Sequence, residues 1–258
     1  MIATLPMYDW PEVRPATDRL WALIRDALRD AGLAAPDALD RSGAYDAAWL
    51  RPDLVLSQTC GLPLRTFLRD RVTLVASPDY GLPGTPPGHY HSVFVVRADH
   101  AGDLASVLGG AIAINGPDSQ SGWAAPQNEA IRLGRPFTAV LVTGAHRDSA
   151  RAVARGAAPV AAIDAQSWRL FERHEPQLAA QLRVAGRTTP TPATPYIAAA
   201  GTDPEPVARA LAAAVAALPS EDRAAIDLRG IARVPLADYL AIPTPALPRQ
   251  DAVPGRPD

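Results

Sequence analysis

Short apolar runs alternate with amphipathic segments along most of the chain. The apolar runs have strand length and predict strands over residues 2–6, 53–57, 72–77, 90–97, 111–114, 137–143, 160–163, 182–188 and 196–200. Helical segments are predicted over residues 17–32, 62–69, 104–108, 128–133, 146–155, 167–172, 204–218 and 220–225, with a further helix start at 119–122 and an interruption at Pro126. Strands that alternate with helices through short connections predict an α/β fold of mainly parallel sheets flanked by helices.

The order of these elements predicts two lobes. The strand series restarts after Asp99, and the Pro-rich segment 189–195 returns the chain before the strand at 196–200. We therefore expect lobe one to comprise residues 1–97 and 190–258 and lobe two to comprise residues 98–189, with crossovers near Arg97 and Thr189. The Pro-rich tail beyond Ile242 is expected to lack regular structure.

Polar side chains gather where the predicted strands end. In parallel sheets, ligands bind outside the carboxyl ends of the strands. Five strand ends carry polar groups there: Tyr8 and Asp9, Ser57 and Gln58, Ser119 to Ser121, His146, and Asp164.

The stretch IAINGPDSQSGWAAP (112–126) is the strongest local pattern. An apolar strand turns through 115–118 and opens a helix at 119–122. A helix start leaves backbone N–H groups unpaired and attracts anions, and Gly122 would let a ligand approach the backbone closely. The alternative is a plain N-cap, in which Asp118 or Ser119 only satisfies the helix start.

Composition narrows the classes of function. The chain of 258 residues has a net charge of −2, which provides no basic field for nucleic acid. It contains no Lys, which excludes a P-loop or Schiff-base lysine, and Cys60 alone cannot form an internal disulfide. No apolar run approaches the length of a membrane span. The N-terminus has no signal-peptide pattern, so we expect a cytoplasmic protein as written, or a periplasmic one if the gene start is truncated.

Several stretches together resemble the phosphate, phosphite and phosphonate-binding proteins of ABC transporters, which are PhnD-like and have the type 2 periplasmic-binding-protein fold. They are DSQSGWAAP (118–126), TGAHRDSARAVARGAAPVAAID (143–164), GHYHSVFVVRAD (88–99) and, more loosely, DLVLSQTCG (53–61). The resemblance covers roughly residues 1–200 in order. It implies a ligand cleft between two lobes.

The resemblance also implies roles for the residues of lobe two. Ser119 and Ser121, with the backbone N–H groups of residues 120–122, would hold the ligand oxygens, and His146 would donate to the same group. Gln120 replaces the usual Thr of the family motif. Asp164 lies two residues before Gln166, the position nearest to the acidic residue that meets an aminophosphonate's amine.

In lobe one, the resemblance implies that Tyr90 donates its hydroxyl and that Ser57 or Gln58 makes a second contact. Simpler roles stay open: Tyr90 can be a packing aromatic, and His146 or Asp164 can be helix caps. His89 and His91 alternate on a strand and with a third ligand could bind a metal, although no nearby Cys or carboxylate completes such a set.

The leading hypothesis is a monomeric solute-binding protein whose lobes close on a small oxyanion without chemistry, cofactor or metal, and which serves an ABC permease. A second hypothesis is a cytoplasmic enzyme on the same fold that acts on a small carboxylate, similar to chorismate dehydratase. A third is a ligand-sensing module that acts through a partner protein.

Overall fold

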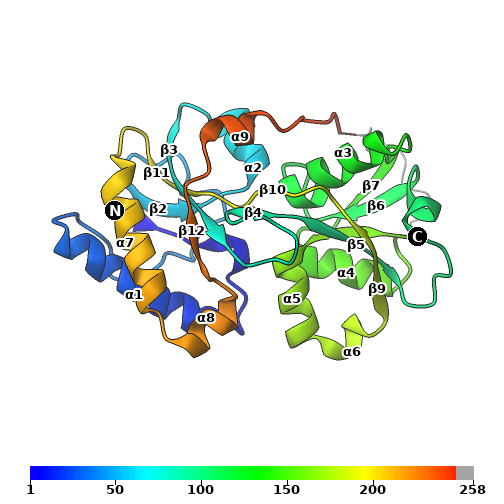
Figure 1. Ribbon diagram of the computed structural model, residues 1–258, viewed down its shortest axis with the longest axis horizontal. Coiled ribbons are helices and arrows are strands. Elements are labelled where there is room, and N and C mark those ends of the chain that lie inside the picture. The colour runs from blue at the N-terminus through cyan, green and yellow to red at the C-terminus, as the bar shows by residue number, and fades with distance from the viewer. Residues whose placement is uncertain (248–258) are drawn as a thin grey trace. The chain divides into compact units, whose positions relative to one another are not determined.

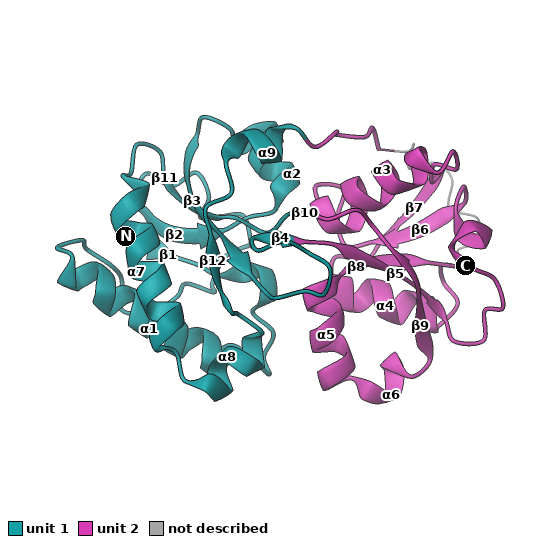
Figure 2. Cartoon of the chain, viewed as in Figure 1, with its two compact units in different colours: residues 1–89, 192–241 teal, residues 90–191, 242–258 magenta. Residues whose placement is uncertain are grey.

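The computed structural model describes residues 1–247 and divides the chain into two compact units (Figures 1 and 2). Unit 1 comprises residues 1–89 and 192–241, and unit 2 comprises residues 90–191 and the chain from Ile242 on. The sequence places the first boundary later, after Arg97, and assigns the tail to the other lobe. The difference arises because the strand Ser92–Arg97 pairs only with strands of unit 2. Of the tail beyond Ile242 that is predicted to lack regular structure, residues 243–247 have no helix or strand, and residues 248–258 lie outside the described residues.

Unit 1 is built around one mixed sheet of five strands among its described residues, in the order β1-β2-β11-β3-β12. Its strands are β1 (Ile2–Ala3), β2 (Leu54–Gln58), β3 (Val72–Asp79), β11 (Tyr196–Ala199) and β12 (Gly230–Ala232). Its helices are η1 (Pro6–Tyr8), α1 (Arg14–Asp30), α2 (Gly61–Pro63), η2 (Leu64–Leu68), α7 (Pro204–Ala217), α8 (Ser220–Ile226) and α9 (Leu236–Leu240). β1 and β2 are parallel, whereas β11 runs antiparallel to both β2 and β3.

Helices cover this sheet on both faces (Figure 1). α1 buries the predicted stripe of Leu20, Trp21, Ile24 and Leu28, and it packs against α7 and α8. On the opposite face, a second core joins Trp49, Leu64, Leu68 and Tyr239 to the sheet residues Leu54 and Ile197.

Unit 2 contains the second five-stranded sheet of the described chain, in the order β7-β6-β8-β5-β9. Its strands are β5 (Ser92–Arg97), β6 (Ala111–Ile114), β7 (Ala139–Val142), β8 (Ala161–Asp164) and β9 (Leu182–Arg187). Its helices are η3 (Leu104–Val107), η4 (Gln120–Ala124), α3 (Ala125–Arg132), α4 (His146–Ala154), α5 (Ala165–His174) and α6 (Pro176–Ala179). β6, β7 and β8 are mutually parallel, and β5 is inserted antiparallel between β8 and β9.

The chain crosses between the units at two short strands. They are β4 (His89–Tyr90) and β10 (Thr191–Pro192), which form a two-stranded sheet of their own. Each crossing is followed directly by a strand that enters a sheet antiparallel to its neighbours, β5 after β4 and β11 after β10. In unit 1, β12 also pairs antiparallel with β3, so both sheets contain parallel pairs but are mixed and not mainly parallel as the sequence predicts.

The predicted interruption at Pro126 is wrong. η4 is π-helical and runs directly into α3, so the helix is continuous from Gln120 to Arg132. In the π register, the N–H groups of Ala124 and Ala125 donate to the carbonyls five residues earlier. The next donor in this register would be residue 126, with the carbonyl of Ser121 as its acceptor, but Pro126 has no N–H. The carbonyl of Ser121 instead accepts a hydrogen bond of 2.8 Å from the hydroxyl of Ser92 in β5. The hydroxyl of Ser92 thus supplies the hydrogen bond that Pro126 cannot donate.

The buried hydroxyl of Tyr239 links α9 to two other segments of unit 1. It donates to the carbonyl of Ala193 at 2.9 Å and is hydrogen-bonded to the hydroxyl of Ser77. Burial raises the pKa of this phenol, so the hydroxyl stays protonated and able to donate.

We expect Tyr239→Phe to lower the free energy of unfolding by about 1–3 kcal/mol, because the substitution leaves the Ala193 carbonyl and the Ser77 hydroxyl buried without this partner. Urea unfolding measures the loss. In a Ser77→Ala background the same substitution should cost less. Equal costs in the two backgrounds would show that the bond to Ser77 contributes nothing.

Candidate anion-binding site

The parallel strands of unit 2 bring the predicted polar residues of lobe two to one edge of the sheet. β6, β7 and β8 point the same way, so the segments that follow Ile114, Val142 and Ile163 all emerge at their carboxyl ends. The antiparallel β5 begins at the same edge, where Ser92 pairs with Asp164. We call the group Ser119, Ser121, His146 and Asp164 the cradle.

His146 contacts Ser121 and Asp164 through the same ring nitrogen, Nε2. Nε2 of His146 lies 2.9 Å from Oγ of Ser121 and 3.3 Å from Oδ2 of Asp164. Oγ of Ser121 also lies 3.4 Å from Oγ of Ser119. Ser119, Ser121 and Asp164 are buried, and 11% of the His146 side chain remains exposed. The structure therefore assembles the four side chains into one buried polar group.

The helix start at Ser119 combines both interpretations drawn from the sequence. The hydroxyl of Ser119 accepts a 2.9 Å hydrogen bond from the N–H of Gly122, so this residue is the N-cap. Of the three N–H groups assigned to a ligand, that of Gly122 is therefore engaged within the helix. The side chain of Gln120 is buried and reaches Thr191, with Nε2 3.4 Å from its hydroxyl oxygen.

Gly122 lies against a side chain that the sequence does not single out. A Cβ atom at this position would fall 1.9 Å from Oδ1 of Asn115, so the end of that side chain would have to move. Ligand contact with the Gly122 backbone stays a prediction.

Burial controls the charge of the histidine. Removal from water lowers the pKa of His146 from its ordinary value of 6.5, and the carboxylate of Asp164 partly opposes the shift. Asp164 is buried, and its other oxygen accepts a 2.9 Å hydrogen bond from the N–H of Ser167, so it also caps α5. The empty cradle thus holds a neutral imidazole beside a buried carboxyl group.

The arrangement is not a catalytic triad. In a triad, the carboxylate orients one ring nitrogen while the other nitrogen takes the proton of the serine. Here Ser121 and Asp164 both lie against Nε2 of His146, so the carboxylate competes with the serine for one nitrogen. The second ring nitrogen, Nδ1, is buried and has no hydrogen-bond partner among the described residues.

Of the residues predicted to act from lobe one, Tyr8, Ser57 and Gln58 belong to unit 1, whereas Tyr90 is the first residue of unit 2. Ser57 is fully buried, and its hydroxyl is 2.6 Å from that of Thr4. Gln58 and Tyr8 line a small cavity of about 30 Å³ in unit 1, together with Tyr80. Tyr90 is buried in β4, at the crossing between the units. Ligand contacts by these four residues stay predictions.

Gln58 has an unusual amide. Its Nε2 is buried and has no hydrogen-bond partner among the described residues, and the same holds for the hydroxyls of Thr59 and Thr194. A backbone hydrogen bond joins the segments that contain Thr59 and Thr194, because the N–H of Thr59 donates to the carbonyl of Pro195. Sequence reasoning missed both threonines, since the hydroxyls are not part of a recognisable motif.

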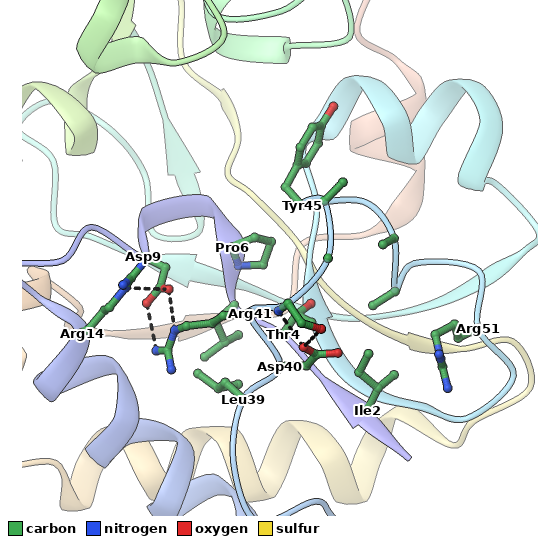
Figure 3. A pocket seen from close by; sticks show the side chains of 16 residues that line it. Ile2, Thr4, Pro6, Asp9, Arg14, Leu39, Asp40, Arg41, Tyr45 and Arg51 are labelled. Carbon is green, nitrogen blue, oxygen red and sulfur yellow. Dashed lines mark hydrogen bonds and ion pairs between the residues drawn. The ribbon is translucent and has the colours of Figure 1, made fainter.

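Unit 1 also contains a larger cavity, of about 410 Å³, that the sequence did not predict (Figure 3). Arg14, Arg41 and Asp9 lie on one wall, and Tyr45 lies at another part of the rim (Figure 3). Asp9 accepts from Arg41 at 2.6 Å and pairs with Arg14 at 3.3 Å. Hydrogen bonding to Asp9 raises the pKa of Arg41. The sequence analysis names Asp9 on this wall, but the two arginines belong to no recognisable motif.

Neither a membrane-spanning helix nor a metal-binding group of side chains is present among the described residues. No helix within residues 1–247 is long and apolar enough to cross a membrane. Within the same residues, no three His, Cys, Asp or Glu side chains are grouped as a metal ion requires, and His91 is buried with its pKa lowered by desolvation.

A sequence model of the family described as "ABC transporter, phosphonate, periplasmic substrate-binding protein" matches residues 41–239. The chain belongs to this family. The matched range includes every cradle residue. Membership in the phosphonate-binding family confirms the resemblance and places the chain among substrate-binding proteins that serve ABC transporters.

Solved structures confirm the type 2 periplasmic-binding-protein fold. PhnD1 from Prochlorococcus marinus in complex with methylphosphonate has a TM-score of 0.68 at 16% identity, covering 92% of this chain and 94% of its own. XAC2383 from Xanthomonas citri bound to ATP has a TM-score of 0.67 at 17% identity, covering 93% and 95%. MatC from Rhodopseudomonas palustris with bound malate has a TM-score of 0.60 at 14% identity, covering 93% and 96%. No curated protein matches the sequence.

We expect Gly122→Ala to lower the free energy of unfolding by about 1–3 kcal/mol, because its methyl group would overlap Asn115. Thermal and urea unfolding measure the effect. Asn115→Ala in the same chain should restore part of the loss. If Gly122→Ala is as stable as the parent protein, Asn115 does not fill this space.

We expect stability to fall as the pH drops below about 6.5, because the unfolded state then binds a proton that buried His146 takes up only at lower pH. The slope reaches at most about 1.4 kcal/mol per pH unit for one proton. His91 has a lowered pKa and adds a contribution of the same sign.

His146→Gln tests this assignment, because glutamine cannot take up the proton. Urea unfolding between about pH 7.5 and 5.5 should show a shallower slope for the variant. Identical slopes for the variant and the parent protein would assign the acid destabilisation to other groups.

Proposed function

We propose that the chain binds a small tetrahedral oxyanion of the phosphonate or phosphate type and does so without chemical turnover. The observation that carries the proposal is the convergence of Ser119, Ser121 and His146 at the start of the continuous helix from Gln120, in a member of the phosphonate-binding family. A helix start provides backbone donors and a partial positive charge, and the hydroxyls add donors that can point at the same oxygens.

The energetics of burial support an anion with several oxygens. An anion that leaves water must have its oxygens hydrogen-bonded, or its desolvation outweighs its binding. Ser121 is suited to this task, because its hydroxyl can accept from Nε2 of His146 and donate its own proton to a ligand. His146 thus acts on the ligand through Ser121, a role that differs from the direct donor expected from the sequence.

The ligands of the structural neighbours are consistent with this class. Their titles record methylphosphonate, ATP and malate, all of which are anions. At identities of 14–17% these neighbours support the fold, and the ligand must be tested on this chain. Malate keeps a small carboxylate in the comparison as the alternative ligand.

Calorimetric titration with methylphosphonate, phosphate, phosphite, sulfate and malate tests the ligand class. We expect a phosphonate, phosphite or phosphate to bind best. Ser121→Ala should weaken that binding by roughly ten- to a hundredfold, because a hydrogen bond to a charged group contributes about 1.5–3 kcal/mol. Ser119→Ala should weaken binding and also cost about 1 kcal/mol of stability as a lost N-cap.

Ser106→Ala is a matched control. It also deletes a serine hydroxyl, but in the exposed helix η3, where Ser106 contacts His100 and Asp103. Its affinity should equal that of the parent protein. Binding of malate alone, or unchanged affinity in both cradle variants, would refute the proposed site.

A further inference from the structure

His146 is the residue through which the cradle can change its charge. Its single contacting nitrogen lies between a hydroxyl that faces the proposed ligand and a buried carboxylate, at 2.9 Å from Ser121 and 3.3 Å from Asp164. A neutral imidazole has at most one proton on that nitrogen, whereas a protonated ring always has one there. The protonated ring would pair with Asp164 and still support the Ser121 hydroxyl.

The charged groups around the histidine come from several elements. On α4 itself, Arg147 pairs with Glu175 and Asp148 with Arg151. Arg169 of α5 and Arg187 of β9 act on a different ring, that of His91, and are not among the charged groups that shift His146. Among the described residues, the charged group in contact with the His146 ring is Asp164, at the end of β8.

An oxyanion in the cradle would bring a second negative charge close to this ring. Asp164 alone does not overcome the burial that keeps the ring neutral in the empty protein. An anion hydrogen-bonded to Ser121 would lie one hydroxyl away from Nε2, in surroundings where charges are weakly screened. Opposite charges at such range favour the protonated form of a histidine.

We propose that the cradle binds its oxyanion together with one proton, which His146 holds between Asp164 and the anion-bound Ser121. This inference rests on the proposed function and adds the determinant of its affinity. Asp164 is then a positioning residue that stabilises the protonated ring. Above neutral pH, each added pH unit should weaken anion binding about tenfold, because one proton enters with each ligand.

Calorimetry in buffers of different ionisation enthalpy counts the proton. The probe is phosphite at about pH 8, more than one unit above its second pKa, where it is mainly a dianion in solution. We expect the uptake of about one proton per ligand. The ³¹P chemical shift of the bound probe should remain that of the dianion, and ¹⁵N spectra should show the His146 ring becoming an imidazolium on binding.

Two substitutions separate the charge from the fold. His146→Gln retains a neutral side-chain donor and should bind the probe more weakly, with almost no proton uptake and a flat pH profile in this range. Asp164→Asn keeps a residue that caps α5 well and removes the carboxylate, so it should take up less than one proton. His100→Gln, whose ring contacts Ser106 of η3, is the matched control and should behave like the parent protein.

The outcomes distinguish this inference from the function on which it rests. Binding without proton uptake, or a ³¹P shift that places the proton on the probe, overturns the inference and leaves the proposed function standing. Unchanged ¹⁵N resonances of His146 on binding overturn it in the parent protein, whatever the variants do. Failure of methylphosphonate, phosphate and phosphite to bind overturns the proposed function and the inference with it.

Discussion

The buried carboxylate of Asp164 is the constraint on which the architecture of unit 2 depends. A carboxyl group with 2% exposure is costly to ionise unless its oxygens are hydrogen-bonded. One oxygen is satisfied by the N–H of Ser167 at the start of α5, and the other faces the ring of His146 at the start of α4. The two helix starts are therefore held at the same strand end, and Ser121 is placed against the shared ring.

The cradle is defined by the kinds of polar group that it brings together. Its contacts come from hydroxyls, backbone groups and a histidine that burial keeps neutral in the empty protein, with no arginine in contact with the cradle among the hydrogen bonds of the described residues. In the proposed complex, the hydroxyl and backbone donors would recognise the number and direction of an anion's hydrogen-bond acceptors, and the charge would come from the proton that His146 takes up.

Much of the fold could be predicted because its signals are local. The apolar run at 111–114 and the helix that begins at His146 appear in the structure where their periodicity places them. β12 and α9 were missed because both are short and lack a clear period. In the cradle, the sequence identified each strand end, since parallel strands bring such ends together. It could not identify Ser92, whose role depends on an antiparallel strand beginning opposite Asp164, nor the contact between Gly122 and Asn115, which depends on how Asn115 folds back.

The hydrogen bond from Ser92 to the carbonyl of Ser121 links two positions that are far apart in the sequence. Pro126 removes a donor that the π register would otherwise supply, and the serine hydroxyl replaces it from another strand. The two positions are therefore coupled through one carbonyl. While Pro126 is present, loss of the Ser92 hydroxyl leaves the Ser121 carbonyl without this donor. A residue with an N–H at position 126 would remove the need for a hydroxyl at position 92.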